Sequence, residues 1–398
     1  MMITRLKLKQ YIAIAYLILM STQYILIEGL GVSNLKFAAM CFAPIIWVSN
    51  FKVFSKAFVA GGIFIIFILF STLYNFGNFR LSTVVYKISF VMMFVAYYDL
   101  VYHNNIFSID EFINLIKKFI IIFFGFLILQ QIVILAGFQS LPIINYVSFL
   151  DRGVGSNSLT LEPSHTARLL TVFMLALLRM YEIKRKHSVL LVSEFFRENK
   201  YVVLAFLWMM ISMGSGTAFA GLAILLLYFM KIQYSIVISS IFIIFYLSIP
   251  YIDFKPFNRA RDIVQASISL DQQRIIDADE SAASRILPFF NTFNSFDYKD
   301  TETWLGNGTD IDEVKYLSKD HKISHIVDYG LICYLVSIIF YLICCSHKIF
   351  SLENLIFIVL MATSINNIAY VWGILMIFTT SNFFIKNATR LNGSDLRL

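Results

Sequence analysis

The sequence has little charge for its length. Asp, Glu, Lys and Arg make up 14% of its 398 residues, whereas soluble domains carry about 25%. Hydrophobic residues make up 59%, and the mean hydropathy is +0.74. So few charges cannot cover an ordinary soluble globular protein, and so apolar a chain is neither disordered nor a typical nucleic-acid binder. The class that remains is an all-α polytopic membrane protein.

Cysteine pairs and a signal-peptide cleavage site are also lacking. The four cysteines lie in apolar runs, so we predict neither a disulfide framework nor a metal site. The basic start MMITRLKLKQ leads into an apolar run that ends near Ile27 with no small-residue cleavage site. This pattern predicts a retained first span. No internal repeat or low-complexity tract is visible.

The apolar runs predict about twelve membrane-spanning helices, since a span needs roughly 20 mostly apolar residues. Segment 201–231 is open to two interpretations: one long helix, or two short helices hinged at Gly214–Gly216, where glycine permits a tight turn. The predicted spans are 11–27, 35–51, 57–76, 81–102, 119–137, 165–183, 201–214, 217–231, 234–250, 325–345, 350–366 and 368–385.

The basic residues of the short loops predict the orientation. With the N-terminus inside, most of them fall on the inner side, and the short outer loops hold only Arg80 and Arg152. Both termini are then cytoplasmic, provided that 201–231 crosses twice. The same count places one long polar loop, 251–324, outside, between spans 9 and 10. We therefore divide the chain into 1–250 with spans 1–9, the loop 251–324 with short helices, and 325–398 with spans 10–12 and a cytoplasmic tail.

Ionisable side chains gather where the sixth span begins. Pro163 suits the first turn of a helix, and Glu162 before it lies where the helix dipole favours a negative charge. His165 and Arg168 follow at the i, i+3 spacing that brings side chains to one face. Ionisable groups at membrane depth are costly, so this cluster is a functional hypothesis set against a plain helix start with an acidic cap.

The long loop supplies further candidates. Arg285 is the strongest of its arginines as a phosphate contact, because the chain returns to apolar surface directly after it. Trp304 opens a Gly306-Asn307-Gly308 turn and has a ring that could stack on a sugar. The small residues from Ser212 to Ala218 favour close helix packing over anion binding.

Two histidines close the loop. His325 lies where the polar loop meets the tenth span, and His321 lies one turn earlier. Histidine is suited to proton transfer near neutral pH. Both remain candidates beside a structural interpretation, and metal binding by the pair is the weaker alternative.

In this order, the motifs resemble the bacterial O-antigen polymerase and ligase superfamily, that is, Wzy-type polymerases and related ligases. Glu162-Pro163-Ser164 matches a Glu-Pro-Ser step into a span, and Ser284-Arg285 matches a Ser-Arg in the long outer loop. The Gly-x-Gly turn at Gly306 and the Tyr329-Gly330 helix start after His325 complete the resemblance. It covers most of the chain as topology and about 40 residues as motif. Two departures stand out: Gly216-Thr217 replaces an expected Arg, and Lys322 replaces the Asn that follows His in ligases.

The resemblance implies an inner-membrane glycosyltransferase that works at the periplasmic face on undecaprenyl-diphosphate-linked glycan. It implies no cofactor, no essential metal and no nucleic-acid partner, but membrane lipid and a chain-length regulator as partners.

A polymerase would join repeat units with inversion, with Glu162 or His325 taking the acceptor proton. Arg285, with Arg168 and Arg152, would hold the diphosphate, and His165, His321 and Trp304 would contact acceptor or sugar. The alternatives are a ligase that transfers glycan to lipid A core and a transporter of polysaccharide or lipid-linked sugar. A transporter is expected to show internal repeats.

Overall fold

The computed structural model describes residues 2–22, 40–45, 54–138, 156–185, 192–229, 261–262, 265, 273, 280–310, 322–364 and 369–394. Throughout these ranges the chain forms helices and short connections, with no strand, which confirms the predicted all-α class. The helices are α1 (Met2–Ser21), α4 (Lys56–Tyr74), α5 (Leu81–Asn104), α6 (Ile109–Leu135), α7 (Pro163–Arg185), α8 (Val192–Ser212), α9 (Gly216–Phe229), α13 (Glu280–Asn294), α14 (Thr301–Leu305), α16 (Ser324–Cys345), α17 (Leu352–Met361) and α18 (Ala369–Ser394).

Four of these helices are long and apolar enough to cross a membrane: α4, α5, α6 and α16. Two more, α9 and α17, are apolar but shorter. The predicted span 350–366 is shortened, because α17 ends at Met361 and a 3₁₀ turn follows at Ala362–Ser364. Most of span 35–51 and all of span 234–250 lie outside the described residues. The structure therefore shows a helical protein with four helices long and apolar enough to cross a membrane among the described residues, while the number twelve stays a prediction.

Segment 201–231 forms two helices. α8 ends at Ser212 and α9 starts at Gly216, and between them Gly214 adopts a positive φ of 59°. α8 also begins earlier than the predicted span, at Val192, with a non-helical residue at Asn199 that separates its first turns from the rest. The interpretation as two helices is confirmed.

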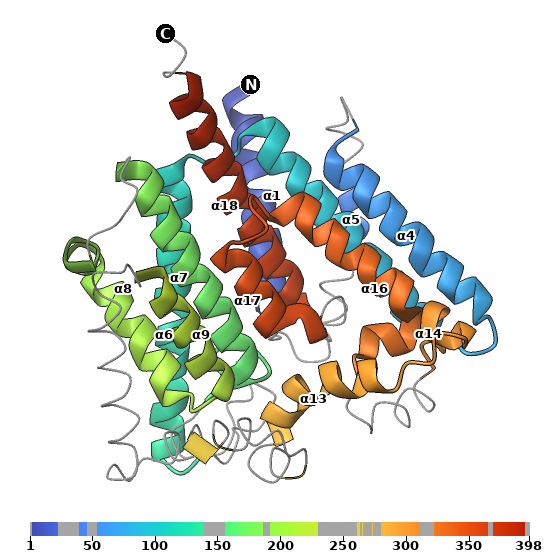
Figure 1. Cartoon of the computed structure of the whole chain (residues 1–398). Coiled ribbons are helices and arrows are strands. Elements are labelled where there is room, and N and C mark those ends of the chain that lie inside the picture. The colour runs from blue at the N-terminus through green and yellow to red at the C-terminus, as the bar shows by residue number, and fades with distance from the viewer. Residues whose placement is uncertain are drawn as a thin grey trace.

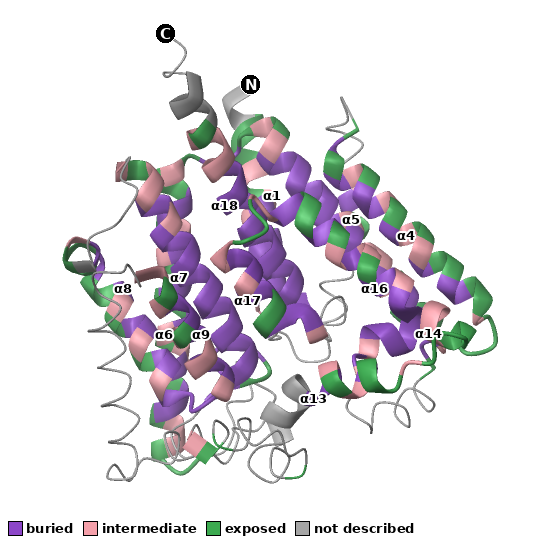
Figure 2. Cartoon of the chain, in the orientation of Figure 1, coloured by how far each residue is buried: buried purple, intermediate pink, exposed green. Residues whose placement is uncertain are grey.

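α7 and α18 form the interior of the bundle (Figures 1 and 2). Nearly every residue of α7 from Pro163 to Tyr181 is buried, although the helix carries several ionisable groups. α18 packs against four helices, α1, α5, α7 and α16. α4, α5 and α16 pack together as a second group, and α6, α8 and α9 surround α7.

The beginning of α1 and the end of α18 lie at one end of the bundle, and α13 and α14 lie at the other (Figure 1). This arrangement agrees with termini on one side and the long loop on the other. Of the predicted loop 251–324, the structure describes α13, α14 and a few further residues. The side of the membrane on which each end lies is part of the functional proposal below.

Candidate functional site

The loop before α7 is held rigidly against α6. The amide of Gln130 donates from Nε2 to the carbonyl of Ser158 (2.8 Å), and Ser158 N–H donates to Gln130 Oε1 (2.7 Å). The hydroxyl of Ser158 donates to the carbonyl of Phe123 (2.6 Å). These buried bonds offset the cost of the positive φ of 51° at Ser158. The start of α7 is therefore fixed by long-range contacts as well as by its own cap.

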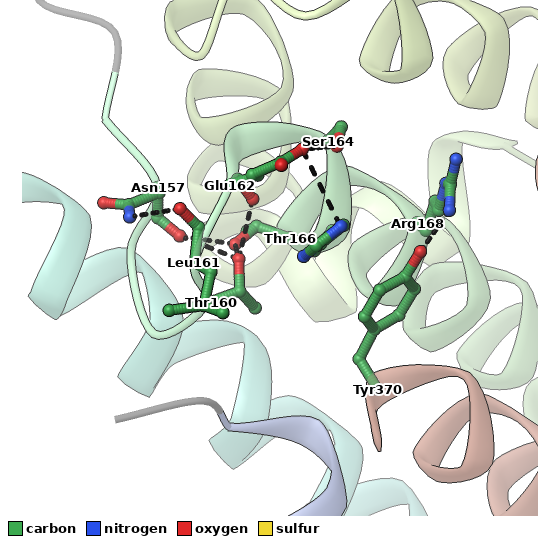
Figure 3. A network of polar contacts seen from close by, with 9 residues as sticks. Asn157, Thr160, Leu161, Glu162, Ser164, Thr166, Arg168 and Tyr370 are labelled. Carbon is green, nitrogen blue, oxygen red and sulfur yellow. Dashed lines mark hydrogen bonds and ion pairs between the residues drawn. The ribbon is translucent and has the colours of Figure 1, made fainter. Parts of the chain in front are cut away.

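Hydroxyl groups complete this turn, as Figure 3 shows. Thr166 donates to the carbonyl of Asn157 (2.5 Å), and the hydroxyls of Thr160 and Thr166 lie 2.8 Å apart. α7 then begins at Pro163, as predicted from the missing N–H of proline.

Glu162 lies at the exposed edge of this turn. Its side chain is 55% exposed and accepts a hydrogen bond from the Ser164 hydroxyl (3.0 Å). His165 Nε2 lies 3.7 Å from the same carboxylate. Glu162 is thus an accessible carboxylate at the N-terminus of α7.

His165 and Arg168 point from Glu162 towards α18. The ring of His165 stacks on that of Tyr370, with centroids 4.3 Å apart. Arg168, buried in α7, donates from Nη1 to the hydroxyl of Tyr370 (Figure 3). The structure therefore brings Glu162, His165 and Arg168 into one cluster, here called the α7 cluster, together with Tyr370. Tyr370 is one of 21 tyrosines, and nothing in the sequence distinguishes it from the others.

A second cluster surrounds His325 in the first turn of α16. His325 is completely buried, and its Nδ1 lies 2.6 Å from Lys87 Nζ on α5. The Lys87 ammonium also lies 3.6 Å from the centroid of the Tyr329 ring. Asp328 is buried beside them and interacts electrostatically with Lys87. We call Lys87, His325, Asp328 and Tyr329 the α16 cluster.

Lys87 was not among the residues singled out from the sequence. The sequence nevertheless contains a feature that marks Lys87 as a candidate. Lys87 is a charged residue inside the predicted span 81–102, and such residues are functional hypotheses by default. Its partner lies 238 positions away, so the pairing itself is invisible in one sequence.

The predicted glycine turn packs directly on the start of α16. The N–H groups of Asn307 and Gly308 donate to the carbonyls of Val327 (2.8 Å) and Asp328 (3.1 Å). α16 is broken at Gly330, where φ is 84° and ψ is 167°. Gly306 and Gly330 approach so closely that a Cβ on either would clash with the other segment. The two glycine motifs of the sequence are thus two halves of one contact.

Trp304 lies next to this turn and is partly buried. Its indole N–H donates to the carbonyl of Tyr298 (3.0 Å), and the ring packs against the small apolar cluster of Ile323, Ile326, Leu331 and Tyr334. Its predicted role in sugar stacking stays a prediction.

Three predicted residues cannot be placed in either cluster. Arg285 belongs to α13 by its backbone, but its side chain lies outside the described part of the structure. Arg152 and His321 lie outside the described residues altogether. Among the residues that are described, no group of three or more His, Cys, Asp or Glu side chains has the geometry of a metal site.

The start of α18 separates the two clusters. Tyr370 faces α7, whereas Trp372 stacks on Phe90 of α5, with centroids 5.7 Å apart and rings nearly parallel. Phe90 lies one turn from Lys87 on the same helix. α7 and α16, whose first turns carry Arg168 and His325, both begin at the end of the bundle where α13 and α14 lie (Figure 1). Four of the predicted site residues, Glu162, His165, Arg168 and His325, therefore lie in two clusters that flank α18.

Comparison with known proteins finds no matching family model, no similar curated protein and no similar solved structure.

Proposed function

We propose that this chain is a glycan polymerase that joins undecaprenyl-diphosphate-linked repeat units at the periplasmic face of the bacterial inner membrane. The observation that supports it is the common location of the two clusters. The Glu-Pro-Ser step with His165 and Arg168, and the Gly-x-Gly turn with His325, both lie at one end of an apolar helical bundle, on either side of α18. These are the motifs on which the resemblance to O-antigen polymerases rests.

The reaction requires little covalent chemistry from the protein itself. A hydroxyl at the non-reducing end of one unit attacks the anomeric carbon of the growing chain, and the bond from that carbon to the diphosphate oxygen breaks. The diphosphate leaves with the bonding electron pair, and direct displacement inverts the anomeric configuration. Glu162 or His325 accepts the proton of the attacking hydroxyl. The protein's main tasks are to hold the diphosphate and to orient the acceptor.

The candidate arginines differ in how they would help to hold the diphosphate. Arg168 is buried and bonded to Tyr370, so it contributes a fixed positive charge beside Glu162. Arg285, on α13 at the same end of the bundle, is the proposed partner for the phosphate oxygens, with Arg152 as a further contact. Membrane lipid surrounds the bundle, both termini face the cytoplasm, and a chain-length regulator is the expected protein partner.

The proposal is tested by complementing a host strain that lacks its own copy of this gene. At matched expression, Glu162→Ala and Arg285→Ala are expected to lower polymer formation at least roughly 100-fold, since a general base or a charge-stabilising donor contributes about that much. The surface glycan is resolved as a ladder of repeat units, and the expected pattern is a single unit attached to the core.

Glu198→Ala and Arg197→Ala are the matched controls, because both residues are exposed on α8, where Glu198 pairs with Arg185 at the opposite end of α7 from the α7 cluster. Their ladders should equal that of the wild type. A full ladder from both site variants would refute the proposal, and a complete absence of glycan on the core would indicate a ligase instead.

A further inference from the structure

Lys87 is a buried lysine with two neighbours that stabilise its ammonium form. Its side chain is only 3% exposed, on a helix that is apolar enough to cross a membrane. The ring face of Tyr329 lies 3.6 Å away, and the carboxylate of Asp328 interacts with it electrostatically. A ring face and a carboxylate both favour the ammonium, and so they offset part of the cost of burying its charge.

The charge of Lys87 decides the hydrogen-bond roles in the pair. An ammonium has three donors and no acceptor, so at 2.6 Å the Nδ1 atom of His325 must accept. A neutral imidazole whose Nδ1 accepts carries its proton on Nε2. An imidazolium is disfavoured here, because it would place an N–H donor and a like charge against Lys87.

Neighbouring side chains enclose the ring of His325. The residue is completely buried, with Phe64 packed edge-on and Tyr334 beside it. The ring also forms a hydrogen bond with the backbone of Cys333, beyond the break in α16. By contrast, more than half of the Glu162 side chain is exposed.

The geometry points to Lys87 as a positioning residue that holds His325 as the neutral Nε2–H tautomer and so leaves Glu162 as the proton acceptor. The second half of this inference rests on the proposed function. In the transfer step, the acceptor O–H bond breaks and its proton moves to a carboxylate oxygen of Glu162. The new bond to the anomeric carbon forms as the diphosphate leaves with its electron pair. His325 exchanges no proton in this step.

The tautomer can be measured without any assay of activity. The full-length protein is labelled with ¹⁵N in the histidine rings, placed in lipid nanodiscs and studied by NMR, and His325→Gln identifies the His325 signals. We expect an unprotonated Nδ1 and a protonated Nε2 in the wild type. A protonated Nδ1, whether in the other neutral tautomer or in an imidazolium, would overturn the inference.

Removing the Lys87 side-chain charge should remove the preference of His325 for the Nε2–H tautomer. Lys87→Met is expected to shift the His325 ring signals, and Lys87→Met combined with Asp328→Asn avoids leaving a buried carboxylate unpaired. Lys117→Met is the matched control, since Lys117 also contacts a tyrosine, Tyr181, but no histidine. Unchanged His325 signals in both Lys87 variants would contradict the role of Lys87.

The assignment of the proton acceptor is tested in the polymerisation assay. Glu162→Gln is expected to lose roughly 100-fold or more of the polymer, as for a general base. His325→Gln should lose at least tenfold less, because the amide oxygen of Gln can accept from Lys87. Equal losses would overturn the assignment to Glu162. If the wild-type chain forms no polymer, the proposed function fails, whereas the NMR result still decides the role of Lys87.

Discussion

Replacing Gly330 by alanine is expected to detach the glycine turn from α16 and to destabilise the protein by roughly 2–6 kcal/mol. The φ and ψ of Gly330 lie in a region that is essentially reserved for glycine, which costs another residue about 1–3 kcal/mol. A Cβ at this position would also lie 2.1 Å from the carbonyl oxygen of Trp304, and overpacking of this kind adds about 1–3 kcal/mol.

The measurement is thermal unfolding of the purified protein with a thiol-reactive dye, because Cys333, Cys344 and Cys345 are buried and only Cys41 is exposed. Tryptic cleavage at the exposed Lys299 should also become faster in the variant. Gly62→Ala is the control: nothing lies within 4 Å of its added Cβ in α4, and alanine is the better helix former. An unfolding temperature for Gly330→Ala equal to that of the control would show that the contact is dispensable.

Arg179→Met is expected to be about as damaging, at the other end of α7. Arg179 donates from Nε to Glu353 Oε1 of α17 (2.8 Å) and from Nη1 to Glu182 Oε2 (2.9 Å), and its guanidinium lies over the ring of Tyr228. The Glu353 side chain is only 4% exposed. Removing the arginine leaves a buried carboxylate without its partner, a change that typically costs about 3–5 kcal/mol.

The same thiol-dye assay measures this loss, and the double variant Arg179→Met with Glu353→Gln should recover most of it, because the stranded charge is then gone. Lys184→Met removes a pair with Asp110 that is half exposed on both sides, so its unfolding temperature should hardly change. If the single and double variants unfold at the same temperature, the pair does not act as described.

The sequence predicted the helices well because membrane crossing imposes a length that can be read along one chain. The predicted ranges 57–76 and 81–102 lie close to α4 and α5, and the start of α7 at Pro163 was anticipated from proline chemistry. The turn at Gly306–Gly308 was also predicted, from glycine alone. These features depend on neighbouring residues only.

The clusters could not be predicted in the same way, because their contacts join helices that are far apart in the sequence. Arg168 meets Tyr370 across 202 positions, and Lys87 meets His325 across 238. A single sequence shows which ionisable residues would cost free energy to bury at membrane depth. It does not show which of them lie next to one another and so offset that cost. That is why His325 was recognised as a candidate while its burial and its lysine were not.

The break in α16 has a consequence for how the chain is assembled during synthesis. The carbonyls of Val327 and Asp328 are satisfied by the turn that follows α14, and that turn is in turn anchored to α4 by the Ser71 hydroxyl on the Leu305 carbonyl (2.6 Å). Unsatisfied carbonyls are costly inside a lipid bilayer. α4 and α14 are both synthesised before α16. α16 can therefore insert against α4 and the turn after α14, whose N–H groups are available for its Val327 and Asp328 carbonyls.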